Sequence, residues 1–402
     1  MIAAEPVIHY LESVSVTLDA KYSEILLIAL LVSFAVCVLN IATERWHGSY
    51  SFDLDLKGIQ KVHTRSVPRT GGIALVVGVI AVPLFAAFDP EARVRAEGGH
   101  VALIALWLAA MPAFVAGIIE DLTKRVSVVT RFCSIVASAL LAAWMLDARL
   151  PRLDIWGIDG LLELLPVSIA LTVFAVAGVS NAINIIDGFN GVAGLTVVVL
   201  LSGMACLGWR EGDITLVQLA LAGIGASIGF LLLNYPGGRL FMGDGGAYFL
   251  GFWVAEIAVL AIVRNPGINA WQVLAMYAYP VIEVLFSIYR RKILRDSLAG
   301  APDRLHLHSL FYRRVARHRL STRRYPWMCN AGVACFVTSW LALATLCALL
   351  FGGTVAGAVV LVAVQVLAYI ATYMRLVRGH WGHCAHPAVI LGLRPQRRLV
   401  AA

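Results

Sequence analysis

The chain has 402 residues, of which 60% are hydrophobic and only 14% charged, and its formal net charge is +8. Soluble globular proteins average roughly 45–50% apolar and about 25% charged residues. The composition therefore excludes a water-soluble globule and predicts a protein that uses the lipid bilayer as its solvent. No soluble domain stands out, and residues 1–402 are predicted to form one transmembrane domain.

Apolar runs long enough to cross a bilayer follow one another along the chain. They predict an all-α, polytopic integral membrane protein with about eleven transmembrane helices, of which the fourth and eighth have the weakest signal. The predicted spans are residues 24–43, 72–88, 101–119, 130–147, 164–183, 192–209, 216–234, 246–263, 271–289, 327–350 and 353–374.

The basic residues are distributed unevenly between the two sets of loops that such spans create. Most of the 32 Lys and Arg fall in one set, above all in 43–71, 290–326 and the basic tail 375–402. Because Lys and Arg accumulate in cytoplasmic loops, the N-terminus is predicted to lie outside and the C-terminus in the cytoplasm. Topology and attraction to anionic lipids and substrates explain the positive charge, so no nucleic acid partner is expected.

Five clusters of polar residues could bind a ligand or take part in catalysis, and all five fall in the loops of the cytoplasmic set. Since the outer loops lack such clusters, the five are predicted to form one site at the cytoplasmic face. The clusters are "KVHTRSVPRTGG" (61–72), "GIIEDLTKR" (117–125), "NAINIIDGFNG" (181–191), "NYPGGRLFMGDGG" (234–246) and "PDRLHLHS" (302–309).

Asp244 stands between Gly243 and Gly245 in the fourth cluster. Glycines let the backbone approach a ligand closely. A carboxylate there suits Mg²⁺, which prefers one or two carboxylates together with phosphates. The alternative is a glycine-rich turn with a solvated aspartate.

Glu120 and Asp121 end the third predicted span and are followed at once by Lys124 and Arg125. The pair is either an interfacial stop or a pair of acids close to a metal and a phosphate. The neighbouring basic residues suit an anionic ligand.

The third cluster repeats a spacing of three residues. Asn181 and Asn184 share a helix face if the helix continues this far, and Asp187 and Asn190 repeat the interval. The asparagine amide offers a donor and an acceptor, as the edge of a nucleobase requires. The alternative is a polar helix cap, because Asn and Asp favour helix ends.

His306 and His308 alternate in a highly basic loop. Their spacing predicts a strand-like or extended segment that presents both rings to one side. Zinc is one reading, but no third ligand is near. Binding of phosphate by the histidines and Arg304 is the more economical interpretation.

Several other features have weaker signals. The tail segment "HWGHCAHP" (380–387) has metal-like spacing, but it lies far from the clusters and is predicted to be interfacial. Glu256 and Glu283 lie within spans, so each either has a functional role or pairs with a neighbouring helix. Gly225 and Gly229 are predicted to serve helix packing. The seven cysteines contain no CxxC pair and predict no disulfide framework.

Together the clusters resemble the polyprenyl-phosphate N-acetylhexosamine-1-phosphate transferase family. "NAINIIDGFNG" is similar to the family pattern NxxNxxDGxDG, "FMGDGGAYFLG" to FMGDxGS and "SVPRTGG" to PTPRGGG. "PDRLHLHS" is similar to the HxHH signature of the branch that starts O-antigen and exopolysaccharide chains, and it does not match the HHH signature of the lipid I branch. The resemblance runs from Lys61 to His308, within a motif-bearing part of about 57–325.

The resemblance implies a role for each matching position. Asp244 and Asn184 would hold Mg²⁺, with Mn²⁺ as a substitute, Asp187 and Asn190 would face uridine, and Asp121 would act near the lipid phosphate. The residues implied for catalysis are Glu120, Asp121, Asp244, His306 and His308. The residues implied for substrate binding are Lys61, Arg69, Asn181, Asp187, Asn190, Phe241 (as a stacking surface) and Arg304.

Three positions depart from the family pattern. Glu120 replaces the first Asp of the usual DD pair and is one methylene longer. Asn190 replaces the second Asp of DGxDG, and Ser309 replaces the final His of HxHH.

The activity implied is transfer of a sugar 1-phosphate from a UDP-sugar to polyprenyl (undecaprenyl) phosphate, with release of UMP, at the bacterial inner membrane. GlcNAc, GalNAc and a 6-deoxy-acetamido sugar all fit, and a homodimer is left open. The lipid I branch and a non-enzymatic lipid transporter or flippase are the alternatives. A transporter predicts polar residues spread through the midplane and both faces.

Overall fold

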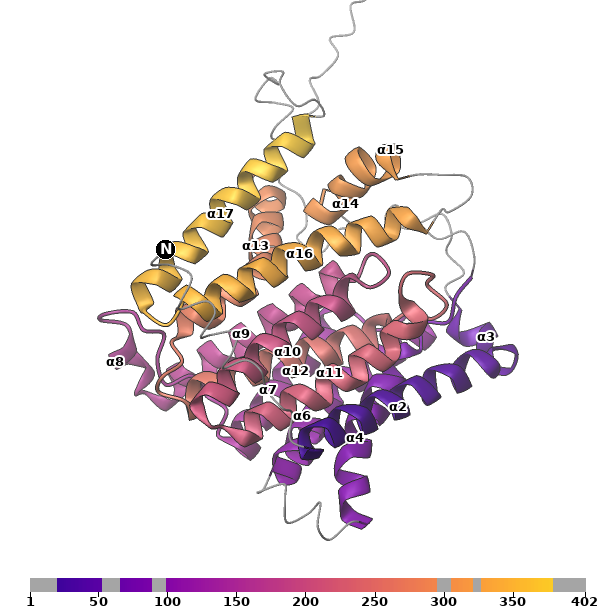
Figure 1. Ribbon diagram of the computed structural model, residues 1–402, viewed down its shortest axis with the longest axis horizontal. Coiled ribbons are helices and arrows are strands. Elements are labelled where there is room, and N and C mark those ends of the chain that lie inside the picture. The colour runs from indigo at the N-terminus through magenta and orange to yellow at the C-terminus, as the bar shows by residue number, and fades with distance from the viewer. Residues whose placement is uncertain (1–19, 53–65, 89–98, 295–304, 321–326, 379–402) are drawn as a thin grey trace, which may run out of the picture.

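The computed structural model describes residues 20–52, 66–88, 99–294, 305–320 and 327–378. In these ranges the chain is helical without strands, and eleven helices are long and apolar enough to span a membrane, as predicted (Figure 1). The two spans with the weakest sequence signal are present as α7 and α12. The long helices are α2 (Ala20–Ala42), α4 (Gly71–Phe88), α6 (Gly99–Thr123), α7 (Val128–Leu146), α9 (Leu165–Ile186), α10 (Val192–Glu211), α11 (Ile214–Asn234), α12 (Gly243–Arg264), α13 (Ala270–Tyr289), α16 (Met328–Phe351) and α17 (Val355–Arg378).

Short elements mark the two ends of the helix bundle. Helix α3, which follows α2, and helix α8, which follows α7, lie at opposite ends of the bundle in Figure 1. The end that carries α3 also carries the segment after α13. The short elements are α3 (Glu44–Ser51), α8 (Asp159–Leu162), η1 (Arg290–Leu294), α14 (Leu307–Phe311), η2 (Tyr312–Ala316) and α15 (Arg317–Arg319).

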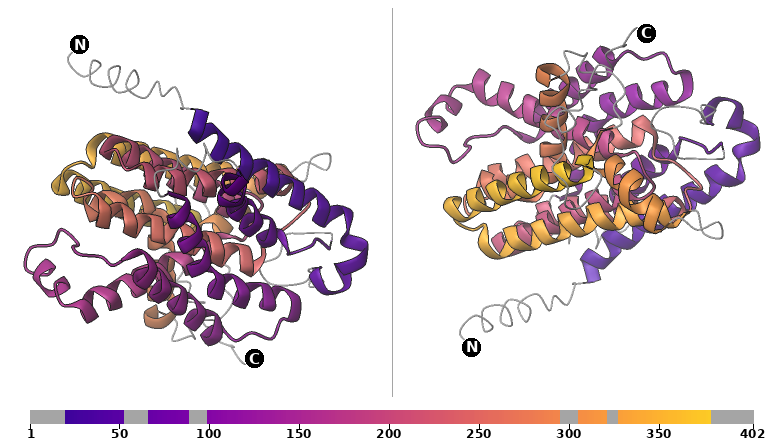
Figure 2. Two further views of the ribbon diagram at one scale, coloured as in Figure 1. Left: turned by 90° about the horizontal axis from the view of Figure 1, so that it is seen from below. Right: turned by 90° about the horizontal axis from the view of Figure 1, so that it is seen from above.

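Helix α12 lies at the centre of the bundle. Within the most apolar 18-residue stretch of α12, 94% is buried inside the protein. The corresponding share is 22% for α2 and for α7 and 17% for α17. Seen from above, α16 and α17 are foremost, whereas α2, α4 and α6 are foremost from below (Figure 2). The residues of α12 therefore contact other helices, while the outer helices present side chains to lipid.

Glycines allow α11 to approach α2 closely. A Cβ atom on Gly225 would lie 2.3 Å from the Leu26 carbonyl oxygen, and one on Gly229 would lie 2.4 Å from the Leu30 carbonyl oxygen. Real Cβ atoms do not come so near to backbone. The prediction that this glycine pair serves helix packing is confirmed, because any larger side chain would push the two helices apart.

The six cysteines in the described ranges are free thiols, in agreement with the absence of a disulfide framework from the sequence. Cys37 and Cys329 are buried among apolar side chains. The seventh, Cys384, and the histidines of the 380–387 segment lie outside the described residues.

Asp213 holds together the end of the bundle that carries α8. Its side chain accepts the Leu216 N–H at the start of α11 and two hydrogen bonds from Arg264, at 2.7 and 2.8 Å. Burial favours the neutral acid, but these bonds and one from Asn265 outweigh it and hold the pKa of Asp213 below its usual value.

We expect Asp213→Asn to lower the free energy of unfolding by about 1 kcal/mol, because the ion pair with the partly exposed Arg264 is lost while the helix cap is kept. A depressed carboxylate pKa stabilises the fold above the unfolded-state pKa of about 4, and the effect disappears as pH falls through the folded value. Thermal unfolding in detergent from pH 8 to pH 3 measures this. A difference from the unsubstituted protein that does not shrink as the pH falls below about 4 contradicts the ion-pair explanation.

Candidate active site

Helix ends from four parts of the chain meet at the end of the bundle that carries α3. The C-termini of α6 and α9 and the N-termini of α4 and α12 place Asp121, Asn184, Arg69 and Asp244 side by side. Four of the predicted clusters therefore do converge, although as many as 175 positions, from Arg69 to Asp244, separate their residues along the chain.

The first turn of α12 is fixed by Asp121, which ends α6. One Asp121 oxygen accepts the Asp244 N–H and the other accepts the Gly245 N–H, each at 2.9 Å. Asp121 is only 2% exposed. The carboxylate thus satisfies two N–H groups that the N-terminus of an isolated helix would leave unpaired, and it lies at the positive end of the helix dipole.

Glycine is required immediately before Asp244. Gly243 has φ +73°, and a Cβ atom there would lie 2.2 Å from the Arg69 carbonyl oxygen and 2.4 Å from a carboxylate oxygen of Asp121. The sequence motif is explained by this crowding: only a residue without a side chain lets α4, α6 and α12 meet at the point from which Asp244 projects.

The Asp244 carboxylate is surrounded by polar partners. Arg131 Nη1 binds one oxygen in a short ion pair, and Arg69 Nη2 lies 3.7 Å from the other. Asn184 Nδ2 donates to that second oxygen at 3.4 Å. Arg69 Nε also lies 3.6 Å from Asp121. Two guanidinium groups therefore neutralise a pair of adjacent carboxylates.

Arg131, on the first turn of α7, was missed by the sequence reasoning. It stands at the edge of a predicted span, where a basic residue is ordinarily read as a topology signal. Its Nε is buried and has no hydrogen-bond partner in the described part of the chain. A buried, unused donor beside a carboxylate is suited to an anionic ligand.

Asp187 follows the last residue of α9 and is partly buried beside this cluster. Burial raises its pKa well above the usual value; the charges of Asp244 and Asp121 raise it further, while Arg69 opposes them. Asn181 lies on α9 one turn before Asn184. Asp187 is thus electrostatically part of the Asp244 group.

The donor set fits a hard divalent cation. The Asp244 carboxylate, the Asp187 carboxylate and the Asn184 amide oxygen are oxygen ligands of the kind that Mg²⁺ prefers. In the described ranges no three His, Cys, Asp or Glu side chains form a complete cage. A cation held by one or two carboxylates and otherwise by phosphate oxygens matches that arrangement.

Asn190 has a structural explanation that its sequence motif did not supply. It is 6% exposed, and its Nδ2 donates to the Pro236 carbonyl at 3.2 Å. The adjacent Gly191 N–H donates to Asn234, whose own amide donates to the Leu240 carbonyl. The 187–191 and 235–242 loops are thereby joined. Uridine contact by Asn190 stays a prediction.

We expect Asn190→Asp, although it restores the residue usual in the family, to lower the free energy of unfolding by about 1–3 kcal/mol. The variant loses the donor to Pro236 and places a carboxylate against a carbonyl oxygen. Thermal unfolding tests this. A variant as stable as the unsubstituted protein would show that the bond to Pro236 contributes nothing.

The histidines adopt a conformation different from the one expected. The prediction of an extended segment is wrong for His308, which is the second residue of α14, whereas His306 precedes that helix in an extended conformation. Both are buried, and their rings are parallel with centroids 5.4 Å apart. His308 Nε2 lies 3.6 Å from the position of a Cβ on Gly188, so the histidine segment meets the loop that carries Asp187.

The remaining predicted residues have separate positions. Glu120 accepts the Val126 N–H at 2.8 Å and so stabilises the turn after α6. Phe241 is half-buried, and its backbone pairs with Pro68 and Gly71 beside the site. Lys61 and Arg304 lie outside the described residues, and their roles stay predictions.

The chain is similar in sequence to proteins of a known family. The model of the family described as glycosyl transferase family 4 matches residues 103–262. An undecaprenyl-phosphate alpha-N-acetylglucosaminyl 1-phosphate transferase of Yersinia pestis is 30% identical over 65% of this chain and 69% of its own length. The chain belongs to glycosyl transferase family 4.

Two more relatives extend the range of this family-4 likeness. An undecaprenyl-phosphate alpha-N-acetylglucosaminyl 1-phosphate transferase of Thermotoga maritima is 25% identical over 66% of this chain and 74% of its own length. A decaprenyl-phosphate N-acetylglucosaminephosphotransferase of Mycobacterium tuberculosis is 26% identical over 61% of this chain and 66% of its own. The family-4 match spans α6 to α12 and so contains Asp121, Asp187 and Asp244.

Proposed function

We propose that this family-4 chain transfers an N-acetylhexosamine 1-phosphate from a UDP-sugar to a polyprenyl phosphate and releases UMP. The observation that supports this most directly is the group formed by Asp244, Asn184, Arg69 and Arg131 at one end of a transmembrane bundle. The relatives named above are N-acetylglucosaminyl phosphate transferases, so UDP-GlcNAc is the donor to test first.

The site is proposed to face the cytoplasm, because the helix ends that form it adjoin, in the sequence, the set of loops that is richest in Lys and Arg. A water-soluble nucleotide sugar and a membrane-held lipid phosphate can both reach that surface. The product would start lipid-linked cell-envelope polysaccharide, of the O-antigen or exopolysaccharide type, at the bacterial inner membrane.

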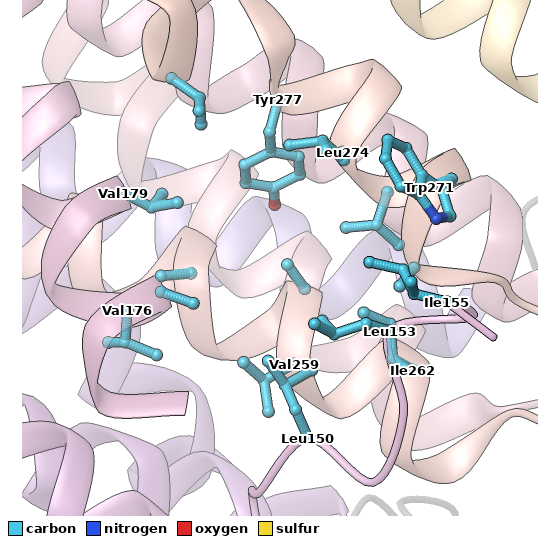
Figure 3. Close-up of a pocket in the computed structure, with 16 residues that line it drawn as sticks. Leu150, Leu153, Ile155, Val176, Val179, Val259, Ile262, Trp271, Leu274 and Tyr277 are labelled. Carbon is cyan, nitrogen blue, oxygen red and sulfur yellow. The ribbon is translucent and has the colours of Figure 1, made fainter. Parts of the chain in front are cut away.

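An apolar groove offers a place for the prenyl chain. It encloses about 260 Å³ and is lined by α9, α12, α13 and the segment before α8, including Val179, Leu153 and Tyr277 (Figure 3). The Tyr277 hydroxyl donates to the Val254 carbonyl, so the wall stays apolar. Much of its lining lies toward the end that carries α8, and Val179, on its inner side, precedes Asn184 by five residues, about 7.5 Å along α9.

The chemistry requires little bond-making from the protein. An oxygen of the lipid phosphate attacks the β-phosphorus of the UDP-sugar, the new P–O bond forms, and the bond to the α-phosphate oxygen breaks to release UMP. A phosphomonoester has a second pKa of about 6, so the nucleophile is largely dianionic at neutral pH. Catalysis is thus positioning and charge neutralisation.

The side chains divide this work. Arg69 and Arg131 bind phosphate oxygens once substrate draws them from the carboxylates. Asp244 and Asn184 would hold Mg²⁺, which would supply positive charge to the diphosphate and to the leaving UMP. Asp121 keeps the first turn of α12 in register, so Asp244 is already oriented before substrate binds.

The rival proposal is a lipid transporter without catalysis. Against it, the polar cluster formed by Asp244, Asn184, Arg69 and Arg131 lies at one end of the bundle. A transporter instead places its binding site near the midplane of the membrane. Purified protein supplied with UDP-GlcNAc and undecaprenyl phosphate should release UMP, and EDTA should abolish the release until Mg²⁺ or Mn²⁺ is added back. Lipid movement without UMP supports the transporter and overturns the enzyme.

A further inference from the structure

Glu283 is a buried carboxylate in a transmembrane helix that the mechanism above does not use. It lies on α13 and is 0% exposed. A carboxylate is costly to bury in a membrane bundle unless polar groups surround it. Glu256 on α12 is equally buried, and neither of its oxygens has a hydrogen-bond partner in the described residues. Glu283 differs because it has several partners.

The partners of Glu283 come from the histidine segment. One oxygen lies 2.9 Å from His306 Nδ1, and the Leu307 N–H lies 3.2 Å from both oxygens. His308 Nδ1 lies 4.0 Å from the second oxygen. Since an ionised carboxylate only accepts, His306 carries a proton on Nδ1, and its Nε2 is the nitrogen left for another ligand.

The first residue of η1, which follows α13 directly, holds the same segment. Arg290 follows Glu283 by seven residues, about two helical turns, and is 2% exposed. Its Nη1 donates to the Leu305 carbonyl and to the Tyr373 hydroxyl of α17, each at 2.9 Å. Helix α13 and η1 together thus hold the backbone at Leu305 and Leu307 and the ring of His306 between them.

The gripped segment contacts the active-site loop directly. His308 lies edge-on to Phe189, with ring centroids 5.8 Å apart, and its Nε2 faces Gly188. Any shift of α14 would therefore move both rings relative to Asp187. Orientation of an imidazole by a carboxylate bound to its other nitrogen is a common way to fix which nitrogen meets a ligand.

We propose that Glu283 is a positioning residue that fixes the tautomer and orientation of His306, and through the shared segment places His308, for contact with substrate phosphate. This inference rests on the proposed function. A purely structural alternative exists, because the carboxylate also accepts the Leu307 N–H at the start of α14. The two are separable: a positioning role needs the His306 ring, whereas a helix cap does not.

The test is a double-mutant cycle on the full chain in lipid nanodiscs, with radiolabelled sugar phosphate transfer as the assay. Glu283→Gln should lower kcat about 10-fold to 100-fold, with KM for UDP-GlcNAc within about threefold, as for loss of a partner that orients a ligand-binding histidine. In a His306→Ala background the same substitution should change kcat less than about twofold. The matched control is Glu256→Gln, an equally buried carboxylate, which should leave kcat unchanged.

Equal losses from Glu283→Gln in both backgrounds overturn the inference and support the helix-cap alternative, as does an unchanged kcat in the single variant. If Glu283→Gln lowers the melting temperature by more than Glu256→Gln does, Glu283→Asp replaces it. That variant keeps the charge but withdraws the carboxylate from His306, and the same criteria apply. Absence of UMP release by the unsubstituted protein would instead count against the proposed function.

Discussion

Asp244→Asn is expected to reduce UMP release by at least about 10³-fold while the protein remains folded and inserted in the membrane. The substitution removes the charge that Arg131 and Arg69 neutralise, and it removes the carboxylate proposed to hold the divalent cation. Loss of one electrostatic contact that acts on the transition state costs about 10²–10³-fold, and loss of the cation's ligand adds to this. UMP release from purified protein measures the effect.

Asp213→Asn is the matched control for this variant. Asp213 is also an aspartate paired with an arginine at a helix N-terminus, but it lies at the opposite end of the bundle. It should lower thermal stability and leave turnover intact, so that lost stability by itself does not account for lost turnover. Turnover by Asp244→Asn within about tenfold of the unsubstituted rate would remove Asp244 from the cation site.

Asp121→Asn should lower kcat by about 10²-fold and also lower the free energy of unfolding by about 1–3 kcal/mol. Both Asp121 oxygens accept N–H groups of the first turn of α12. The asparagine amide replaces one acceptor by a donor, so one N–H loses its partner and Asp244 shifts. Steady-state kinetics and thermal unfolding of one preparation give both values.

The paired measurement distinguishes two roles for Asp121. A general base that made no structural contribution would lose kcat at unchanged stability. Asp159 offers the control, since its carboxylate also accepts two backbone N–H groups, from Leu153 and Ile155, at the end remote from the site. Asp159→Asn should not alter kcat.

The sequence by itself determined the membrane class, the number of spans and the residues of the polar clusters. The class and the number of spans follow from the length and apolarity of each run. The bilayer thickness sets the length that a spanning helix needs, and this requirement does not depend on other helices. The packing role of Gly225 and Gly229 was predictable for the same reason: small residues on one helix face signal close approach before the partner helix is known.

Only the tertiary structure decided how the clusters are connected. Arg131 belongs to the site because the first turn of α7 lies beside α12. The spacing of these residues along the chain does not predict that contact. Glu283 grips His306 from 23 positions away, and α14 begins where an extended segment was expected. The amide of Asn190 donates to the carbonyl of Pro236 in another loop, and this contact explains why an amide is suited to the position. Contacts of this kind depend on which helix ends meet, and that is set by side-chain packing across the whole bundle.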